Sequence, residues 1–523
     1  MSLEPHAAEA VIVETQAAVD EKAKLKKHFG RFDMLFFLIC TLVGVDTLGA
    51  VASNGPEGFT WLIVLAVLFF VPYALLTAEL GSAFTDEGGC YVWTKLAFGR
   101  FTAAVQSVLY WLSNPIWLGG SLTITAVATF GDFFTPLNGA GKYLFSLAFI
   151  WFAVWAAILS FGIGKWIPTI GAWVRIGVLG IFVLTVILYA IDHGVHGVSA
   201  GDFKPTWAIF IAAVPVLFFN YVGFELPNAA GDEMEDPQKD VPFTVIRAAF
   251  GTFVLYGAPI LAILLVLPTA QITSLGGFID AMKTVFTVYG GHVETAKDGT
   301  VTATLTGAGK VLGDLAAIGF ILALLSSGTT WIMGADRSQA VAGFDGAAPR
   351  SFGYFSARWG TPVVVNVLSG VFSTIVMVLA FQLTGNADKY FTAVLGLAIS
   401  TTTISYLVVF PAVIKLRYTH AHVPRPYRVP WGNKGAWICG LLCTGWSMLA
   451  TVALLYPGFG TSDPDSSLPD GWAGQRGAYE ASQFIPLAVL VALGVLFYVL
   501  GAPTRAKQVE VPLADPTLTA SAT

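Results

Sequence analysis

The stretch CTLVGVDTLG at residues 40–49 decides the fold, because it sets two glycines and an acid in the middle of an apolar segment. A second stretch, NYVGFELP at residues 220–227, combines a glycine, an acid and a proline in the same way. Glycine weakens a helix and proline removes a backbone donor, so we expect both stretches to interrupt helices. Inside a lipid bilayer such an interruption is tolerated only where protein or a water-filled cavity surrounds it.

The surrounding sequence predicts an all-α integral membrane protein. Apolar residues make up 55% of the chain and charged residues only 12%, against about 25% charged residues in soluble domains. Four long blocks contain no Asp, Glu, Lys or Arg, and each is long enough to cross a hydrocarbon core of about 30 Å. These blocks are 59–78, 101–131, 315–335 and 390–414. The apolar pattern predicts twelve transmembrane helices, at 33–53, 59–84, 101–130, 143–163, 167–191, 206–230, 243–267, 311–335, 361–384, 389–415, 435–456 and 483–502.

Basic residues predict the orientation, because they collect on the cytoplasmic side of a membrane. With both termini in the cytoplasm, 20 of the 28 Lys and Arg residues lie on the inner side. Arg175 lies within a helix, and the remaining seven are on the outer side: Lys142, Lys204, Lys283, Lys297, Lys310, Lys389 and Arg476. We therefore expect a multi-pass protein of the cell (plasma) membrane. Residues 1–30 are polar, and the first apolar run follows them with no small-residue cleavage site and is followed by many more runs, so we interpret them as a cytoplasmic tail and not as a cleaved signal peptide.

This pattern divides the chain into four parts. The expected parts are the tail 1–30, a ten-helix transport core at 31–416, two further helices with an external loop at 417–502, and a second cytoplasmic tail at 503–523. One external stretch, 292–307, alternates Thr and Val around Asp298-Gly299, a two-residue turn signal. This stretch predicts a small β-hairpin.

The two interrupted helices lie five helices apart, at corresponding places of two possible repeats. Broken helices in such positions indicate a transporter site near the middle of the membrane. The alternative is that the glycines only allow helices to pack closely. Each interruption also carries an ionisable residue, and such residues inside membranes usually serve function. We therefore favour a binding site.

Four motifs then give a resemblance. They are TAELGSAFTDEGGCYVW at 77–93, GFELPNAAGDEMEDPQKDVP at 223–242, Arg337 with DGAAP at 345–349 and GTP at 360–362, and LRYTHAHVPRPYRVP at 416–430. In this order and spacing the chain resembles the amino acid–polyamine–organocation superfamily over residues 31–502. The resemblance implies an inverted five-plus-five helix fold of the leucine-transporter type, two additional helices, and alternating access around the two breaks.

Asp46 departs from the pattern of the amino acid carriers in that family, whose first break is short, rich in glycine and receives a substrate carboxylate. A fixed carboxylate there repels an acid and attracts an ammonium group, so we expect Asp46 and Glu225 to face a cationic amine. The segment 44–46 looks similar to the polyamine-uptake members. The alternative is a neutral amino acid permease in which Asp46 pairs internally with Arg175. The candidate substrate-binding residues are Gly44, Asp46, Thr47, Gly49, Asn114, Phe219, Tyr221, Gly223 and Glu225.

Arg175 lies about nine residues, or about 13 Å, into its helix. Some family members have a lysine at the matching place, where it resembles a substitute for sodium. An arginine stays charged and carries no proton, so the hypothesis is sodium-independent transport with proton coupling on Glu225, or exchange. The alternative is that Arg175 extends to the inner surface. The candidate ion-coupling residues are Arg175, Glu225, Ser326, Ser327 and Thr329.

Other classes of function fit the sequence less well. An ion channel usually shows a repeated pore loop or a charged ring, and neither is present. An enzyme needs clustered catalytic residues or His-Glu-x-x-His spacing, and the chain has no such motif and no Gly-rich phosphate loop. We expect no cofactor, no metal, no nucleic acid and no enzyme activity. The expected partners are the lipid bilayer and a small amine or amino acid, in a monomer or homodimer.

Overall fold

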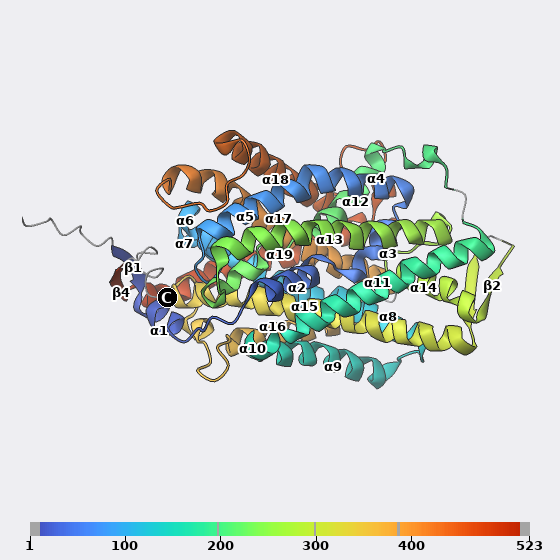
Figure 1. Ribbon diagram of the computed structural model, residues 1–523, viewed down its shortest axis with the longest axis horizontal. Helices are drawn as coiled ribbons and strands as arrows, with labels where there is room; N and C mark the ends of the chain where they lie inside the picture. Colours follow the sequence, from blue (N-terminus) through green and yellow to red (C-terminus); the bar gives the residue numbers. More distant parts are fainter. Residues whose placement is uncertain (1–10, 160, 196–197, 298–299, 384–386, 513–523) are drawn as a thin grey trace, which may run out of the picture.

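The computed structural model describes residues 11–512, apart from 160, 196–197, 298–299 and 384–386. The helices form one elongated bundle with distinct ends (Figure 1). A β-hairpin, β2 (Gly291–Thr295) and β3 (Val301–Leu305), lies at the end that we call the hairpin end. At the opposite end, which we call the tail end, β1 (Val11–Thr15) pairs antiparallel with β4 (Gln508–Pro512).

Ten helices of the described chain are long and apolar enough to cross a membrane. They are α2 with η1 and α3 (Arg31–Leu42, Val45–Thr47, Leu48–Ala52), α4 with η2 and α5 (Gly55–Leu65, Ala66–Phe70, Val71–Ala83), α9 (Gly139–Ile158), α11 (Trp166–His193), α13 (Pro237–Val266), α15 (Gly307–Phe344), α16 (Val363–Leu383), α17 (Ala387–Thr419), α18 (Gly432–Leu455) and α19 (Arg476–Leu500). Two more lie in the same bundle: the more polar α7 with η3 and α8 (Arg100–Trp117, Leu118–Leu122, Thr123–Phe133), and the short α12 (Trp207–Asn220). Together they account for the twelve predicted helices.

Several short elements connect the long helices, and the sequence pattern did not predict them because they are too short to show a membrane-spanning run. They are α1 (Gln16–Lys22), α6 (Cys90–Phe98), α10 (Phe161–Gly164), α14 (Gly277–Phe286), α20 (Ala502–Arg505) and the 3₁₀ turns η4 (Ala200–Phe203), η5 (Leu226–Glu233), η6 (Thr269–Gln271), η7 (Thr287–Tyr289), η8 (Arg350–Gly353) and η9 (Pro464–Ser467). The predicted hairpin is confirmed, with Val293 opposite Ala303. Its expected turn, Asp298-Gly299, lies outside the described residues.

Both predicted helix interruptions are confirmed. The first helix ends at Leu42, and its 3₁₀ turn η1 begins at Val45, after two intervening residues. The sixth helix stops at Asn220 and continues only as the 3₁₀ segment η5. Between them Gly223 has φ of +124°, a conformation that residues with a side chain rarely adopt.

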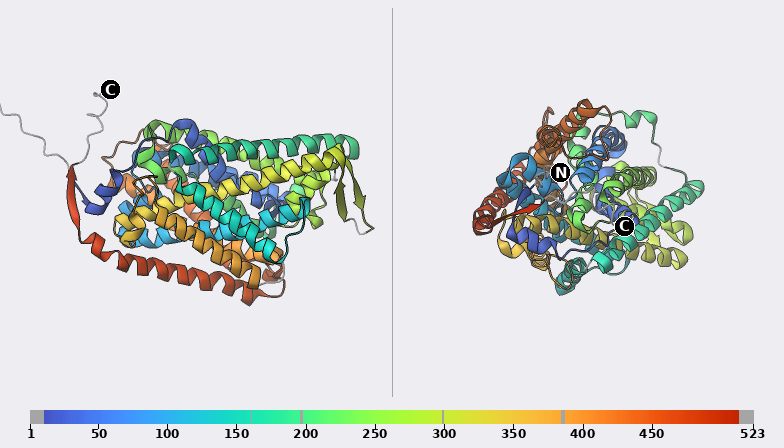
Figure 2. Two further views of the ribbon diagram at one scale, coloured as in Figure 1. Left: turned by 90° about the horizontal axis from the view of Figure 1, so that it is seen from below. Right: turned by 60° about the vertical axis from the view of Figure 1, so that its left-hand side comes forward.

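The two broken helices lie inside the bundle and the last helix lies at its edge. Every residue from Leu42 to Ala52 is buried, and so is every residue from Phe210 to Asn220 apart from Ala212. By contrast α19 lies along the outside (Figure 2) and buries only a few of its side chains. The position of α19 leaves its apolar side chains free to contact lipid. The breaks, with their polar main chain, are kept away from lipid by the surrounding helices.

Candidate substrate and ion site

The end of α2 is held open by side chains from three other helices. The carbonyls of Cys40, Thr41 and Leu42 would have no partner at a helix end, whereas the carbonyl of Ile39 already accepts from the N–H of Val43. The carbonyls of Ile39, Cys40, Thr41 and Leu42 each accept a hydrogen bond from a different side chain: Arg175 (3.4 Å), Ser327 (3.3 Å), Trp331 (3.1 Å) and Tyr256 (3.0 Å), respectively. The surrounding helices therefore stabilise the interruption, because their side chains donate hydrogen bonds to the main-chain carbonyls at the end of α2.

Asp46 lies in the 3₁₀ turn just after the break and is only 2% exposed. Its Oδ2 accepts hydrogen bonds from Trp117 Nε1, at 2.8 Å, and from the Ser121 hydroxyl. Its Oδ1 accepts no hydrogen bond from another residue in the described part of the chain. Trp117 and Ser121 come from the end of α7 and from η3, which is a π-helical turn. Such turns are frequent at functional sites.

The other candidates on the first helix lie on either side of Asp46. Gly44 donates its N–H to the Tyr256 hydroxyl, at 2.7 Å, and its carbonyl accepts a hydrogen bond from Thr47, also at 2.7 Å. Both residues therefore shape the break. Gly49 lies further on, where a β-carbon would stand 2.7 Å from the carbonyl oxygen of Ser274. Gly49 thus allows the helix to approach the loop before α14.

Glu225 follows the second break and is 1% exposed. Its Oε1 accepts hydrogen bonds from the hydroxyls of Tyr110, at 2.7 Å, and Tyr406, at 2.5 Å. Within the described ranges no side chain donates to its Oε2. Tyr110 lies on α7 and Tyr406 on α17, so this carboxylate joins the second break to two neighbouring helices.

An aromatic cluster connects the two acids. Trp331 of α15 has its ring centroid 6.1 Å from that of Trp117 and 6.2 Å from that of Tyr110. Trp117 holds Asp46, Tyr110 holds Glu225, and Phe219 packs edge-on against Trp117 at 5.6 Å. The faces of aromatic rings attract cations. Two carboxylates joined by tryptophan and tyrosine rings therefore form surroundings that favour a cation over an anion.

Three other predicted residues have different surroundings. Asn114 on α7 is buried, and neither of its side-chain polar atoms has a hydrogen-bond partner among the residues described. Tyr221 donates to the carbonyl of Leu62, at 3.0 Å, and stacks on Phe70, so it binds the second helix. A β-carbon on Gly223 would lie 2.4 Å from the Thr41 side chain, so this glycine allows the two broken helices to touch.

Arg175 is fully buried between the first, fifth and eighth helices. Its guanidinium donates to the carbonyls of Ile39 (3.4 Å) and Ala323 (2.9 Å) and to the hydroxyl of Ser327 (2.5 Å). It is also 3.4 Å from the Ser326 hydroxyl. The guanidinium is thus surrounded by carbonyl and hydroxyl oxygens, which are also the ligands that bind small metal cations.

Arg175 forms no ion pair with Asp46 or with any other acid in the part of the chain that the structure describes. Thr329 has no hydrogen bond to Arg175 among the described residues, and its hydroxyl donates to the carbonyl of Leu325 in its own helix. The structure thus brings Arg175, Ser326 and Ser327 together and leaves Thr329 outside this set of hydrogen bonds.

The residues of the sequence motifs meet at the tail end. Glu79 binds both Arg417 and Arg425 and accepts a hydrogen bond from the N–H of Val429, at 2.8 Å. Arg337 binds Glu87 (3.2 Å) and Glu233 (3.1 Å). These contacts join segments far apart in the sequence and close the tail end of the bundle.

A third tail-end group lies around Asp345, just after α15. Asp345 accepts hydrogen bonds from Tyr91 (2.6 Å), Lys95 (3.0 Å) and Arg100 (2.9 Å). Burial alone would raise the pKa of this carboxyl, but Lys95 and Arg100 outweigh it and hold the pKa below its ordinary value of 3.8. The group therefore stays ionised at neutral pH and ties the end of the eighth helix to the start of the third.

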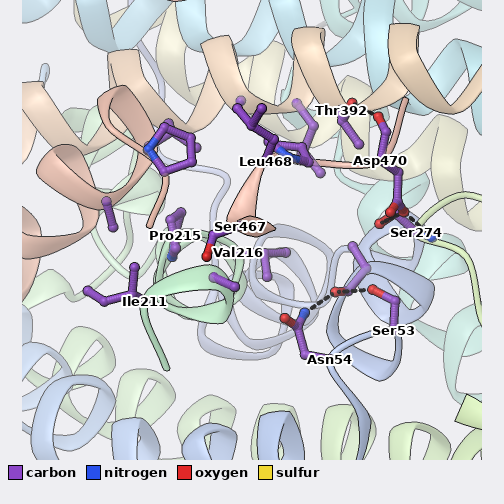
Figure 3. Close-up of a pocket in the computed structure, with 18 of the residues that line it drawn as sticks. Ser53, Asn54, Ile211, Pro215, Val216, Ser274, Thr392, Ser467, Leu468 and Asp470 are labelled. Atoms are coloured by element: carbon purple, nitrogen blue, oxygen red, sulfur yellow. Dashed lines mark hydrogen bonds between the residues drawn. The ribbon is translucent and has the colours of Figure 1, made fainter. Parts of the chain in front are cut away.

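A cavity of about 390 Å³ opens at the hairpin end (Figure 3). Ser53 and Asn54, which follow α3, line it together with Pro215 and Val216 of α12. The cavity therefore borders the hairpin-side halves of both broken helices. The loop before α19 contributes Ser466 to Asp470, and Asp470 accepts hydrogen bonds from Ser274 on the facing loop. In the described residues, no three His, Cys, Asp or Glu side chains are grouped as a metal site.

Comparison with known proteins identifies the family of this chain. A family model described as "Amino acid permease" matches residues 29–469 of the chain. The chain belongs to the amino acid permease family. It is thus a member of the superfamily that its motifs resemble, and the match includes both breaks, Arg175 and the tail-end network.

Curated relatives of this permease include amine and amino acid carriers. A probable agmatine/putrescine antiporter of Lactococcus lactis is 27% identical over 77% of this chain and 83% of its own. A polyamine transporter of Oryza sativa is 25% identical over 80% of this chain and 73% of its own. A branched-chain amino acid permease of Bacillus subtilis is 24% identical over 79% and 86%.

A solved structure supports the fold of this permease. A mutant manganese transporter of Eremococcus coleocola superposes on 96% of this chain and 97% of its own with a TM-score of 0.55 and 12% identity. At that identity the likeness supports the fold alone. The predicted architecture, five plus five inverted helices and two further helices, is confirmed.

Proposed function

We propose that this permease is a secondary transporter of cationic amines that works by alternating access around its two broken helices. The observation that carries the proposal is Asp46, a buried carboxylate beside unwound main chain with one oxygen fixed by Trp117 and Ser121 and the other unpaired within the described chain. An ammonium group supplies the positive charge and the N–H donor with which such an oxygen can pair. Without a partner of this kind, burying a carboxylate costs free energy. The names of the agmatine/putrescine and polyamine relatives support this substrate class.

The alternative, a neutral amino acid permease in which Asp46 serves Arg175, has less support. The hydrogen bonds of Arg175 go to carbonyl and hydroxyl oxygens, while Asp46 binds Trp117 and Ser121. The two side chains therefore have separate partners.

Arg175 supports sodium independence. Its fixed charge already occupies the oxygen-lined space between the first, fifth and eighth helices, so a sodium ion there would meet direct repulsion. We propose that amine exchange or protons drive transport, with Glu225 as one proton-carrying acid. Replacing sodium by choline on both sides of proteoliposomes should leave the flux unchanged. A flux that disappears in choline contradicts this assignment.

We further propose that the hairpin end faces outward and that both tails are cytoplasmic, in the plasma membrane. This orientation follows from the excess of basic residues near the tail end. Residues 31–416 would then form the transport core, and α18 and α19 would support it from outside. In this orientation the cavity at the hairpin end is the entrance used in an outward-facing state.

The test of the substrate class is counterflow in proteoliposomes preloaded with putrescine. Labelled putrescine and agmatine should exchange, and labelled leucine should not. Asp46→Asn keeps the size of the side chain and removes its charge, so amine exchange should fall by at least about 100-fold, equivalent to about 2.7 kcal/mol of binding. Asp20→Asn, at an exposed acid of α1, is the matched control and should behave like the wild type. Unchanged amine exchange in Asp46→Asn, or faster exchange of leucine than of putrescine, would overturn the proposal.

A further inference from the structure

Asp336, on α15, is a buried acid that the proposed substrate site does not use. It is 0% exposed and lies eight residues before the tail-side end of α15, or about 12 Å along the helix. Its Oδ1 accepts one hydrogen bond, from the Ser369 hydroxyl of α16 at 2.8 Å. Across the described ranges, no group donates a hydrogen bond to its Oδ2.

A short chain of hydrogen bonds fixes this acid between three helices. Trp111 of α7 donates its indole N–H to Ser369 Oγ at 2.8 Å, and Ser369 in turn donates to Asp336. Trp111 packs against Phe372, at 5.7 Å between ring centroids, which keeps the site apolar on that side. The acid therefore has a preformed place whose described donors are neutral groups, Ser369 and behind it Trp111.

Charged groups on the packed elements are engaged elsewhere. The next residue, Arg337, binds Glu87 and Glu233, and α16 contains no ionisable residue. On α9 the ionisable residues lie near its hairpin-side start. Several other ionisable groups on neighbouring elements have partners of their own: Tyr110 binds Glu225, Tyr91, Lys95 and Arg100 bind Asp345, Arg350 binds Glu21, and Cys90 lies against Ser338.

These surroundings favour the neutral form of the carboxyl. Burying an ionised carboxylate costs several kcal/mol unless a cation or several donors compensate it, and one serine hydroxyl is a small compensation. A bound proton removes the charge and also gives the second oxygen an O–H group. The ligand that fits this site is therefore a proton, which water at the tail end would supply.

We propose that Asp336 is a proton-binding site of this permease, separate from Asp46 and Glu225, that loads and releases a proton as the tail end closes and opens. The adjacent Arg337 belongs to the tail-end network, so opening of that network would bring water to Asp336. The proposal rests on the proposed transport function. It adds a second acid to the proton pathway, on the eighth helix.

The direct test is infrared spectroscopy of the purified protein, which detects the C=O stretch of a protonated carboxyl without requiring transport. Spectra recorded between about pH 5 and about pH 9 should show a band that disappears at high pH. The component of the band that comes from Asp336 should be missing in Asp336→Asn, while a component from Glu225 would remain. The Asp336 component should remain in Asp314→Asn, which removes an acid of the same helix that is paired with Lys310. A band that persists unchanged in Asp336→Asn overturns the proposal.

A second variant tests the site if Asp336→Asn folds poorly. Ser369→Ala keeps the acid and removes its nearest donor, so the ionised form loses stabilisation and the band should persist to higher pH. In putrescine counterflow the wild-type rate should change by up to about tenfold per pH unit near the midpoint of the Asp336 titration. The rate in Asp336→Asn should not depend on pH in this range. A titrating band without amine exchange would contradict the substrate proposal alone. Equal pH profiles in the wild type and Asp336→Asn would contradict proton coupling at Asp336.

Discussion

Gly223 shows how a single residue sets the geometry of the site. Its φ of +124° turns the chain just after α12 ends, and its missing side chain lets Thr41 and Trp331 approach from the first and eighth helices. The Gly223 N–H then donates to the Tyr73 hydroxyl at 3.1 Å. One residue thus provides the turn, the close contact and the freed main chain that place Glu225.

Gly223→Ala should therefore impair both stability and transport. The added carbon would stand 2.4 Å from Thr41 in a backbone conformation that alanine avoids, so we expect a loss of about 1–3 kcal/mol in the free energy of unfolding. Amine exchange should fall at least about tenfold. Gly257→Ala on α13 is the control, because a β-carbon there meets no atom within 4 Å. Thermal unfolding and counterflow measure the two effects, and equal behaviour of the two variants would contradict the role of Gly223.

The sequence pointed to some residues of the candidate site and not to others, for a physical reason. Asp46 and Glu225 stood out because acids are rare in apolar runs. Trp117, Ser121 and Tyr406 also hold the acids, but such residues occur throughout helix contacts and carry no pattern of their own. The Gly119-Gly120 pair beside Ser121 was the available signal, because it lies in the π-helical turn that positions that hydroxyl.

At the scale of elements, Asp345 joins α15 to α6 and α7. Because its folded pKa lies below the ordinary 3.8, its ion pairs stabilise the fold above that pH and are lost as the pH falls through the folded pKa. Asp345→Asn should lower the free energy of unfolding by about 1–3 kcal/mol at neutral pH. The difference from the wild type should shrink only below pH 3.8.

Denaturation in detergent over a series of pH values measures this difference. Asp236→Asn removes an acid from an exposed pair with Lys239 and should change stability by at most about 0.5 kcal/mol. A cost at Asp345 that is constant down to strongly acidic pH would show that charge is not its role.

The elements themselves divide into those that the sequence specifies and those that tertiary contacts impose. Long apolar runs specify the membrane helices, and Gly with Pro specifies where two of them break. The β1–β4 pair forms because distant segments meet, as Val13 does with Glu510. No local period reveals such partners, so these elements appear only in the folded bundle.

At the scale of the whole molecule, the two ends of the bundle differ. The hairpin end has a cavity of about 390 Å³ beside both broken helices, while the ion pairs of Glu79, Arg337 and Asp345 close the tail end. The sequence predicted the architecture but not which end is closed. That choice depends on a small free-energy difference between two packings of the same helices, to which the tail-end ion pairs contribute.

Labelling of an introduced cysteine tests this balance. All four natural cysteines are buried, so Ser467→Cys in the wall of the cavity should be the site that reacts with a membrane-impermeant thiol reagent added outside cells. Glu79→Gln removes the charge that binds Arg417 and Arg425, which weakens closure of the tail end by up to about 3–5 kcal/mol. The population then shifts toward a state with a closed hairpin end, and labelling should slow about threefold or more. Glu294→Gln, on the exposed hairpin, should leave the labelling rate unchanged. If Glu79→Gln also left the rate unchanged, the tail-end ion pairs would not govern access, and reaction from the inner side alone would reverse the proposed orientation.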